Sequence, residues 1–149
     1  MKKGIELYKH QEEFVYKHHK KHLLAWEVGS GKTLAAIASA DIQGFDILVV
    51  CPKSLKDQWE SEIEKFSERP EDYKVMTKEE FKKFHKDLRY FNFVIIDEAH
   101  NFANYKSQLH KSMIWYLKKH ERTQRICPPK TMCMVIPAAE ITDLMVKIE

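Results

Sequence analysis

Two glycines followed by a lysine and a threonine are the first residues of this chain whose types and spacing suggest chemistry. The chain has four glycines, and two of them flank Ser30 directly before Lys32 and Thr33. Backbone N–H groups of Gly29, Ser30, Gly31 and Lys32 can point at phosphate oxygens, and the N-terminal end of a following helix adds to the attraction. The Lys32 ammonium would reach the β- and γ-phosphates, and the Thr33 hydroxyl would ligate Mg²⁺. This stretch predicts a phosphate-binding loop for ATP and Mg²⁺.

A pair of carboxylates supplies the second chemical signal. Asp97 is the last residue of the predicted strand Phe91–Asp97, and Glu98 follows it directly. An apolar strand cannot readily bury two carboxylates at its end unless they meet a cation or solvent. Asp97 is placed to hold Mg²⁺, directly or through its water shell, and Glu98 to orient and deprotonate a water that attacks the γ-phosphate. The plain alternatives are a glycine turn next to a surface lysine and an acidic helix N-cap. The two stretches together favour a nucleotide site.

The elements that must position these residues follow from periodicity. Apolar runs predict strands, and amphipathic segments between them predict helices. Ser54 is a predicted helix N-cap, and Thr77 with Glu80 has capping-box spacing. This alternation predicts an α/β fold with a mostly parallel central sheet, helices on both faces, and ligands at the carboxyl ends of the strands. The predicted strands are 23–28, 46–52, 73–77, 91–97 and 131–137, and the predicted helices are 5–22, 32–43, 54–66, 78–88, 105–120 and 138–148.

Length and composition restrict the class of protein. The 149 residues suffice for one domain, 1–149, with a full core, and the net charge of +3 permits a polyanionic partner without requiring one. Cys51, Cys127 and Cys133 form no C-x-x-C pair, which predicts free thiols in a reducing cytoplasm. No apolar run approaches the roughly 20 residues that span a bilayer. Charges also follow the first lysines where a signal peptide would be apolar. We therefore predict a mature cytoplasmic protein with no membrane partner.

Taken together, these stretches resemble the superfamily-2 helicases and translocases of the Swi/Snf-type branch. The segment "DEAHNFAN" at 97–104, followed by Ser107, is similar to that branch's DEAH-x-x-x-N-x-x-S motif, and Trp59-Glu60-x-Glu62 is also typical of it. The family's phosphate loop often lacks its first glycine, which is replaced here by Trp26. The resemblance implies a RecA-like P-loop NTPase domain that binds ATP and Mg²⁺ and acts on DNA, duplex DNA in this branch.

The resemblance also assigns roles to further residues. "LYKHQEEFV" is similar to the segment whose glutamine, here Gln11, reads the adenine edge, so residues 1–22 are expected to form an adenine-recognition helix region. A glutamine suits adenine because its amide group can form hydrogen bonds with adenine N6 and N7 at the same time. Pro52, Lys53 and Ser54 match a turn that contacts the nucleic-acid backbone. His100 matches the histidine that links the γ-phosphate site to the nucleic-acid side of the domain.

Two departures from the family shape the expected activity. The family works with two RecA-like domains, of which the second supplies an arginine finger worth about 10³ to 10⁵ in rate. A second RecA-like domain, in cis or in trans, is therefore an expected partner, and this chain alone is expected to hydrolyse ATP slowly. Residues 120–149 do not resemble the family, and "VIPAA" at 135–139 stands where hydroxyl side chains are expected. The alternative function is a catalytically silent nucleotide-binding or protein-interaction module. For a phage or bacterial chain, a nucleoid or host-cytoplasm location is also expected.

Two other groups of side chains receive plainer interpretations. His18 and His22 have i, i+4 spacing, but no third ligand is spaced to complete a metal site, which favours a solvated basic helix face. Trp26, Trp59 and Trp115 lie among apolar neighbours and are interpreted as core residues.

Overall fold

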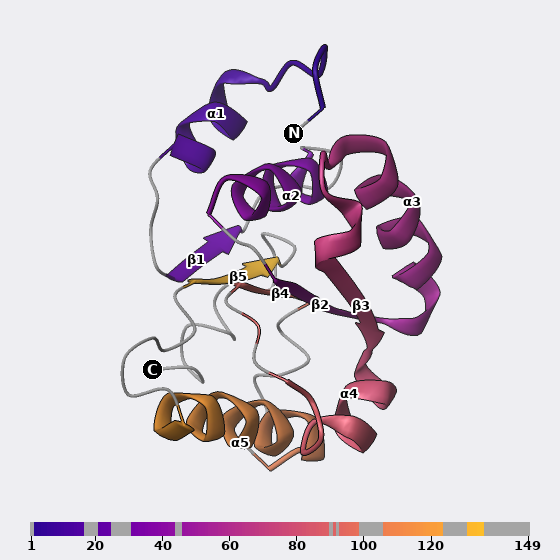
Figure 1. Cartoon of the computed structure of the whole chain (residues 1–149), viewed down its shortest axis with the longest axis vertical. Coiled ribbons are helices and arrows are strands. Elements are labelled where there is room, and N and C mark those ends of the chain that lie inside the picture. Colours follow the sequence, from indigo (N-terminus) through magenta and orange to yellow (C-terminus); the bar gives the residue numbers. More distant parts are fainter. Residues whose placement is uncertain are drawn as a thin grey trace.

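Five parallel strands form a sheet between two layers of helices (Figure 1). The computed structural model describes residues 2–16, 21–24, 31–43, 46–89, 91, 93–98, 106–123 and 131–135. The helices are α1 (Lys9–Tyr16), α2 (Lys32–Gln43), α3 (Lys56–Phe66), α4 (Lys78–Phe84) and α5 (Gln108–Thr123), with 3₁₀ turns η1 (Lys53–Leu55) and η2 (Pro70–Asp72). The strands are β1 (Lys21–Leu24), β2 (Ile47–Cys51), β3 (Tyr73–Thr77), β4 (Phe93–Asp97) and β5 (Thr131–Val135).

The strands lie in the order β1-β5-β4-β2-β3, and every neighbouring pair is parallel. Val135 pairs with Leu24 on one side and with Asp97 on the other. Cys51 pairs with Thr77. Since Val50 pairs with Ile96, Cys51 is also level with Asp97, the residue after Ile96. The carboxyl ends of all five strands are therefore level. In sheet order these end residues are Leu24, Val135, Asp97, Cys51 and Thr77.

Each face of the sheet buries its own apolar cluster, because strands covered on both sides are apolar throughout. β2 and β4 are buried at every position. Helices α2 and α3 cover one face, and α4 and α5 cover the other (Figure 1). The cluster under α2 and α3 includes Ala36, Ile37, Ala40, Val49, Trp59, Ile63 and Ile95. The cluster under α4 and α5 includes Leu48, Val50, Phe81, Phe91, Ile96, Leu109, Met113 and Tyr116.

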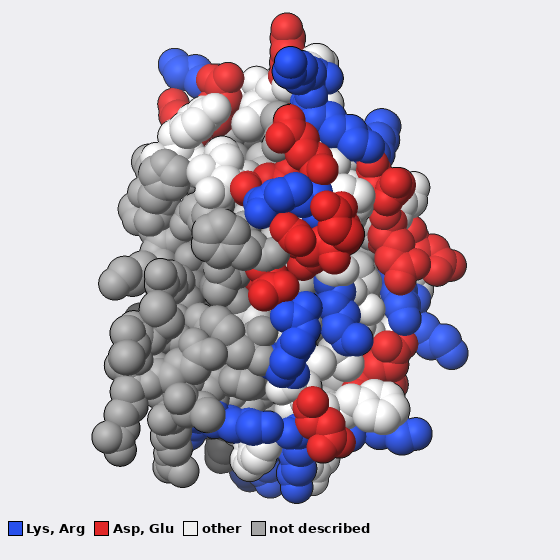
Figure 2. All heavy atoms as spheres, in the orientation of Figure 1, with Lys and Arg blue, Asp and Glu red and all other residues white. Residues whose placement is uncertain are grey.

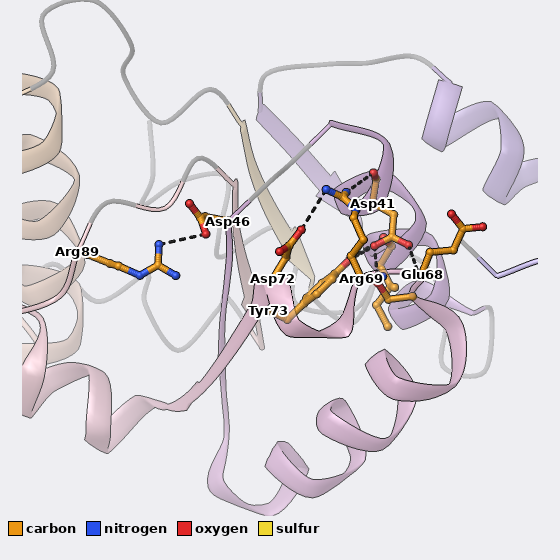
Figure 3. Close-up of polar contacts among 9 residues, drawn as sticks. Asp41, Asp46, Glu68, Arg69, Asp72, Tyr73 and Arg89 are labelled. Carbon is orange, nitrogen blue, oxygen red and sulfur yellow. Dashed lines mark hydrogen bonds and ion pairs between the residues drawn. The ribbon is translucent and has the colours of Figure 1, made fainter.

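A polar network ties the end of α2 to the loop before β3 (Figure 3). The Asp41 carboxylate accepts hydrogen bonds from the Ser67 hydroxyl and the Tyr73 hydroxyl, each at 2.6 Å. Arg69 donates to the Asp41 carbonyl oxygen at 2.6 Å and pairs with Asp72 at 3.1 Å. Burial raises the pKa of Asp41, but the bonds from Ser67 and Tyr73 outweigh burial and hold this pKa below its ordinary value. The network fixes the far end of the helix that begins at the predicted phosphate loop.

The predicted N-terminal elements need correction. The helix expected over 5–22 is wrong in extent, because α1 ends at Tyr16 and both Lys21 and His22 belong to β1. Pairing with β5 gives these two residues sheet hydrogen bonds, which helical periodicity cannot anticipate. His22 therefore does not lie on a helix, and His18 lies outside the described residues. Of the strand expected over 23–28, residues 25–28 lie outside the described residues, as does the helix expected over 138–148.

The two predicted N-caps have different outcomes. Ser54 is not the cap of α3, because the chain first makes the turn η1 and Leu55 occupies the cap position without a side-chain bond. Thr77 is confirmed as the cap of α4, since its hydroxyl accepts a hydrogen bond from the Glu80 N–H at 3.1 Å. The Glu80 side chain instead accepts from Lys56 at 3.0 Å.

Thr77→Ala should lower the free energy of unfolding by about 1 kcal/mol, the usual value of a lost N-cap. The hydroxyl lies at the junction of β3 and α4, so its loss leaves the Glu80 N–H without this acceptor. Urea denaturation followed by circular dichroism measures the change. Thr77→Ser keeps the hydroxyl and should recover most of the loss. Equal stability of the alanine and serine variants would contradict the role of the cap.

No helix among the described residues is long and apolar enough to cross a membrane.

Candidate nucleotide site

The carboxyl edge of the sheet brings the predicted site residues together. The end of β1 and Asp97 are separated by β5 alone, so they lie about 10 Å apart at the usual strand spacing. The same edge carries the turn after β2 and the start of α4 after β3. Three predicted residues, Gly29, Ser30 and His100, lie outside the described residues.

The described part of the predicted phosphate loop leads directly into a helix N-terminus. Gly31 has a φ of +80°, a left-handed conformation that glycine adopts without strain. Lys32 and Thr33 form the first turn of α2, and both are half-buried. The backbone N–H groups of a first helical turn lack partners within the helix, so they can meet an anion. Because α2 contacts β4 and β5, the helix that begins with this turn is packed against the central strands.

Gln11 lies against the phosphate loop. Its side chain is 1% exposed, and its Nε2 donates to the Gly31 carbonyl oxygen at 3.0 Å. Its Oε1 accepts from the Tyr8 N–H at 2.8 Å, so both ends of the amide are oriented. An amide group offers four hydrogen-bonding positions, and these two contacts leave capacity for a ligand. The structure thus places Gln11 beside the loop, while its contact with adenine stays a prediction.

Gly31→Ala should destabilise the protein more than Gly4→Ala does. Both glycines have positive φ, but a Cβ at Gly31 would lie 2.2 Å from the Gln11 Nε2, whereas a Cβ at Gly4 meets nothing within 4 Å. The Gly4 variant therefore measures backbone strain alone, about 1–2 kcal/mol, and the Gly31 variant adds displacement of the buried Gln11 amide. Chemical denaturation of the two variants gives the comparison. Equal losses would contradict the tight contact between Gln11 and the loop.

The Asp97 carboxylate is held by two donors. It is 8% exposed, and its Oδ2 accepts from the Trp59 indole Nε1 at 2.7 Å. Its Oδ1 accepts from the Glu98 N–H at 2.9 Å. Burial raises the pKa of Asp97 above its ordinary value, against the Trp59 bond, which lowers it. A buried carboxylate in this position would be stabilised by a cation, and its oxygens are ligands of the kind Mg²⁺ prefers.

Glu98 occupies a strained backbone conformation. Its φ is 54°, in the left-handed region that residues other than glycine rarely adopt, and it is the only described non-glycine residue with positive φ. The side chain is half-buried directly after β4. Strain of this kind clusters at active sites, where the surrounding structure holds it in place. Here it ends the extended backbone of β4 immediately after Asp97.

Three residues near this edge were not selected from the sequence as site residues. Trp59 was interpreted as a core side chain, which its 2% exposure confirms, but spacing gave no sign of its bond to Asp97. Lys78 is buried at the start of α4, where burial lowers its pKa while the charges of Glu98 and Asp97 raise it. Cys51 is a buried free thiol, as predicted, and burial with the nearby Asp97 charge raises its pKa to about 12.

The predicted nucleic-acid contacts lie at the same edge. Pro52 is half-buried, and Lys53 and Ser54 are exposed in η1, directly after β2. Because β2 neighbours β4, this exposed turn follows the strand beside Asp97. An exposed lysine and hydroxyl on a turn are suited to contact phosphate oxygens.

Comparison with known proteins identifies the family and the fold. Residues 8–83, just over half of the chain, match the SNF2-related domain. This range includes Gln11, the phosphate loop, η1 and Trp59, and it ends before Asp97. No curated protein is significantly similar in sequence.

Among solved structures, the chain resembles the Sulfolobus solfataricus SWI2/SNF2 ATPase core in complex with dsDNA. The TM-score is 0.70 at 20% identity, over 97% of this chain and 34% of the other. The fold is therefore RecA-like, as predicted, and the chain spans about a third of the length of that structure.

Proposed function

Because the chain belongs to the SNF2-related domain family, we propose that it is the ATP-binding half of a DNA helicase or translocase motor. The observation that carries the proposal is the arrangement of the carboxyl edge. The first turn of α2 follows β1, and the Asp97–Glu98 pair follows β4, with only β5 between them. A nucleotide whose phosphates lie at the helix N-terminus would have its γ-phosphate near the two carboxylates.

Each part of the nucleotide has proposed partners in this chain. Gln11 recognises adenine. The backbone N–H groups from Gly29 to Thr33 bind the phosphates, and the Lys32 ammonium reaches the β- and γ-phosphates. The Gln11 bond to the Gly31 carbonyl oxygen supports a shared site, because it joins the base-reading residue to the phosphate loop.

Thr33 and Asp97 would hold Mg²⁺, which neutralises charge that develops on the phosphates when it is bound. The Trp59 N–H orients Asp97 for this role by fixing one of its oxygens. Glu98 orients the attacking water and accepts its proton as the water attacks the γ-phosphate in line and the β–γ bond breaks. His100 would connect this site to the nucleic-acid side of the domain.

DNA and a second RecA-like domain are the proposed partners. Pro52, Lys53 and Ser54 would contact the DNA backbone from η1. The similar archaeal ATPase core was solved with dsDNA, and this chain covers about a third of it, which supports duplex DNA and a further domain. That domain would supply the arginine finger, and the motor would act in the cytoplasm or at the nucleoid.

Lys32→Ala should weaken ATP binding about 10- to 150-fold, because each charge-assisted hydrogen bond that is lost is worth about 1.5–3 kcal/mol. Isothermal titration of the chain with ATP and Mg²⁺ measures this. The matched control is Lys53→Ala, which should keep its ATP affinity and lose affinity for duplex DNA. Unchanged ATP affinity in the Lys32 variant, or no binding by the wild-type chain, would contradict the proposal.

The catalytically silent alternative is separated by turnover. Single-turnover hydrolysis is measured with and without duplex DNA, and again after a separately expressed second RecA-like domain is added. A motor half should gain DNA-stimulated turnover from that domain. ATP binding without any such gain would favour the silent module.

A further inference from the structure

Charge is divided unevenly between the two helical layers. Residues 106–119, which contain most of α5, include four lysines and no aspartate or glutamate. By contrast, α3 carries four acidic residues against two lysines. Figure 2 shows lysine and arginine side chains along the lower edge of the molecule, where Figure 1 places α4 and α5. Together, α4 and α5 carry seven lysine and arginine residues against three glutamates, so this layer has an excess of positive charge in a protein whose net charge is only +3.

An exposed tryptophan belongs to this basic layer. Trp115 was predicted to be a core residue, which is wrong, because it is 40% exposed on the outer side of α5. The buried stripe of that helix is Leu109, Met113 and Tyr116. We name its surroundings the Trp115 face, which consists of Lys86, Lys111, Ile114, Trp115, Lys118 and Lys119.

Two lysines lie over the Trp115 ring, and His85 packs against the ring in a T-shaped arrangement. The ammonium groups of Lys119 and Lys86 lie 5.2 and 6.0 Å from the ring centroid, and Lys119 also donates to the Lys86 carbonyl oxygen at 2.6 Å. Lys111 and Lys118 lie four residues before and three after Trp115, on the same face of α5. Among the side chains that the structure describes, a set that excludes Glu121 of α5, Lys86, Lys111 and Lys118 form no ion pair with a carboxylate.

We propose that the Trp115 face binds single-stranded nucleic acid, with a base stacked on Trp115 and phosphates bound by the surrounding lysines. Like charges gathered on one face repel one another, and a polyanion relieves that repulsion. Only an unpaired strand offers both a phosphate and a free base face to an exposed indole, since a duplex hides its base faces. An acidic peptide would meet the charge without supplying a planar base for the ring.

This site goes beyond the proposed motor function. The Trp115 face lies in the layer opposite α2, on the other side of the sheet, whereas the predicted DNA contacts belong to η1 at the carboxyl edge (Figure 1). Binding at the Trp115 face needs no nucleotide. It should therefore persist in the Lys32→Ala chain, so failure of either proposal leaves the other standing.

The test is fluorescence anisotropy of labelled oligo-dT without nucleotide. Trp115→Ala should bind oligo-dT roughly 5- to 150-fold more weakly, the range for loss of one stacked base. Trp115→Phe keeps an aromatic face and should lie between wild type and the alanine variant. The double variant Lys111→Gln with Lys118→Gln should reduce the slope of log affinity against log salt by about 1.4, at about 0.7 per phosphate contact on a single strand.

Matched controls separate this face from the rest of the surface. Lys65→Gln with Lys74→Gln removes two exposed lysines outside α4 and α5 and should leave the salt slope unchanged. Unchanged affinity in both Trp115 variants, with folding verified by circular dichroism, would overturn the proposal. If Trp115→Ala lost as much affinity for a duplex of the same length as for oligo-dT, base stacking would be overturned. If polyglutamate competed more strongly than unlabelled oligo-dT, the partner would be an acidic protein instead.

Discussion

Glu98→Gln should bind ATP and Mg²⁺ almost as well as the wild-type chain and hydrolyse ATP about 10²- to 10⁴-fold more slowly, the usual contribution of a general base. The substitution keeps the size of the side chain and leaves the backbone N–H of residue 98 bonded to the Asp97 carboxylate, but the amide cannot accept a proton from the attacking water. Glu98 is half-buried directly after Asp97. Its carboxylate could therefore contact a water that lies between it and a γ-phosphate.

Single-turnover hydrolysis with excess protein measures the rate, because the isolated chain is expected to be slow. Glu79→Gln is the matched control, since it removes an exposed carboxylate near the start of α4 and should leave the rate unchanged. If Glu98→Gln hydrolyses ATP as fast as the wild-type chain, Glu98 is not the base. If it fails to bind ATP, its role is in binding.

Trp59→Phe should lower the free energy of unfolding by about 2–4 kcal/mol. The substitution removes a hydrogen bond to a buried carboxylate, which is worth about 1.5–3 kcal/mol, and leaves part of the indole volume empty. Trp115→Phe changes the same side chain at an exposed position and should cost less than about 0.5 kcal/mol. Denaturant melts of both variants give the comparison.

A double-mutant cycle with Asp97→Asn isolates the bond from the cavity. The raised folded-state pKa of Asp97 means that the native state holds this proton more tightly than the unfolded chain does. The ionised carboxylate therefore opposes folding at neutral pH, and it opposes folding less as the pH falls toward its folded pKa. Asp97→Asn alone should stabilise the protein at neutral pH and weaken ATP binding in the presence of Mg²⁺. Trp59→Phe should lower the free energy of unfolding by less in the Asp97→Asn background than in the wild-type background. Equal losses in the two backgrounds would contradict a stabilising bond between Trp59 and Asp97.

Local features of the sequence were enough to predict the strands β2, β3 and β4 and the cap at Thr77. Each of these depends on side chains a few residues apart, whose periodicity or capping geometry is a property of the segment itself. The residues selected as phosphate and metal ligands were chosen from local features of the same kind, a glycine turn and a terminal carboxylate pair, and their roles as ligands stay a prediction.

Only the tertiary structure decided how these segments meet. Strand order placed β5 between β1 and β4 and levelled their ends, so the end of β1 and the carboxylate pair share one edge. The bonds from Trp59 to Asp97 and from Gln11 to Gly31 join residues 38 and 20 positions apart. Trp59 and Trp115 were interpreted alike, yet one is buried and the other exposed. Burial depends on which element packs against a helix face, and long-range packing leaves no local pattern from which it can be predicted.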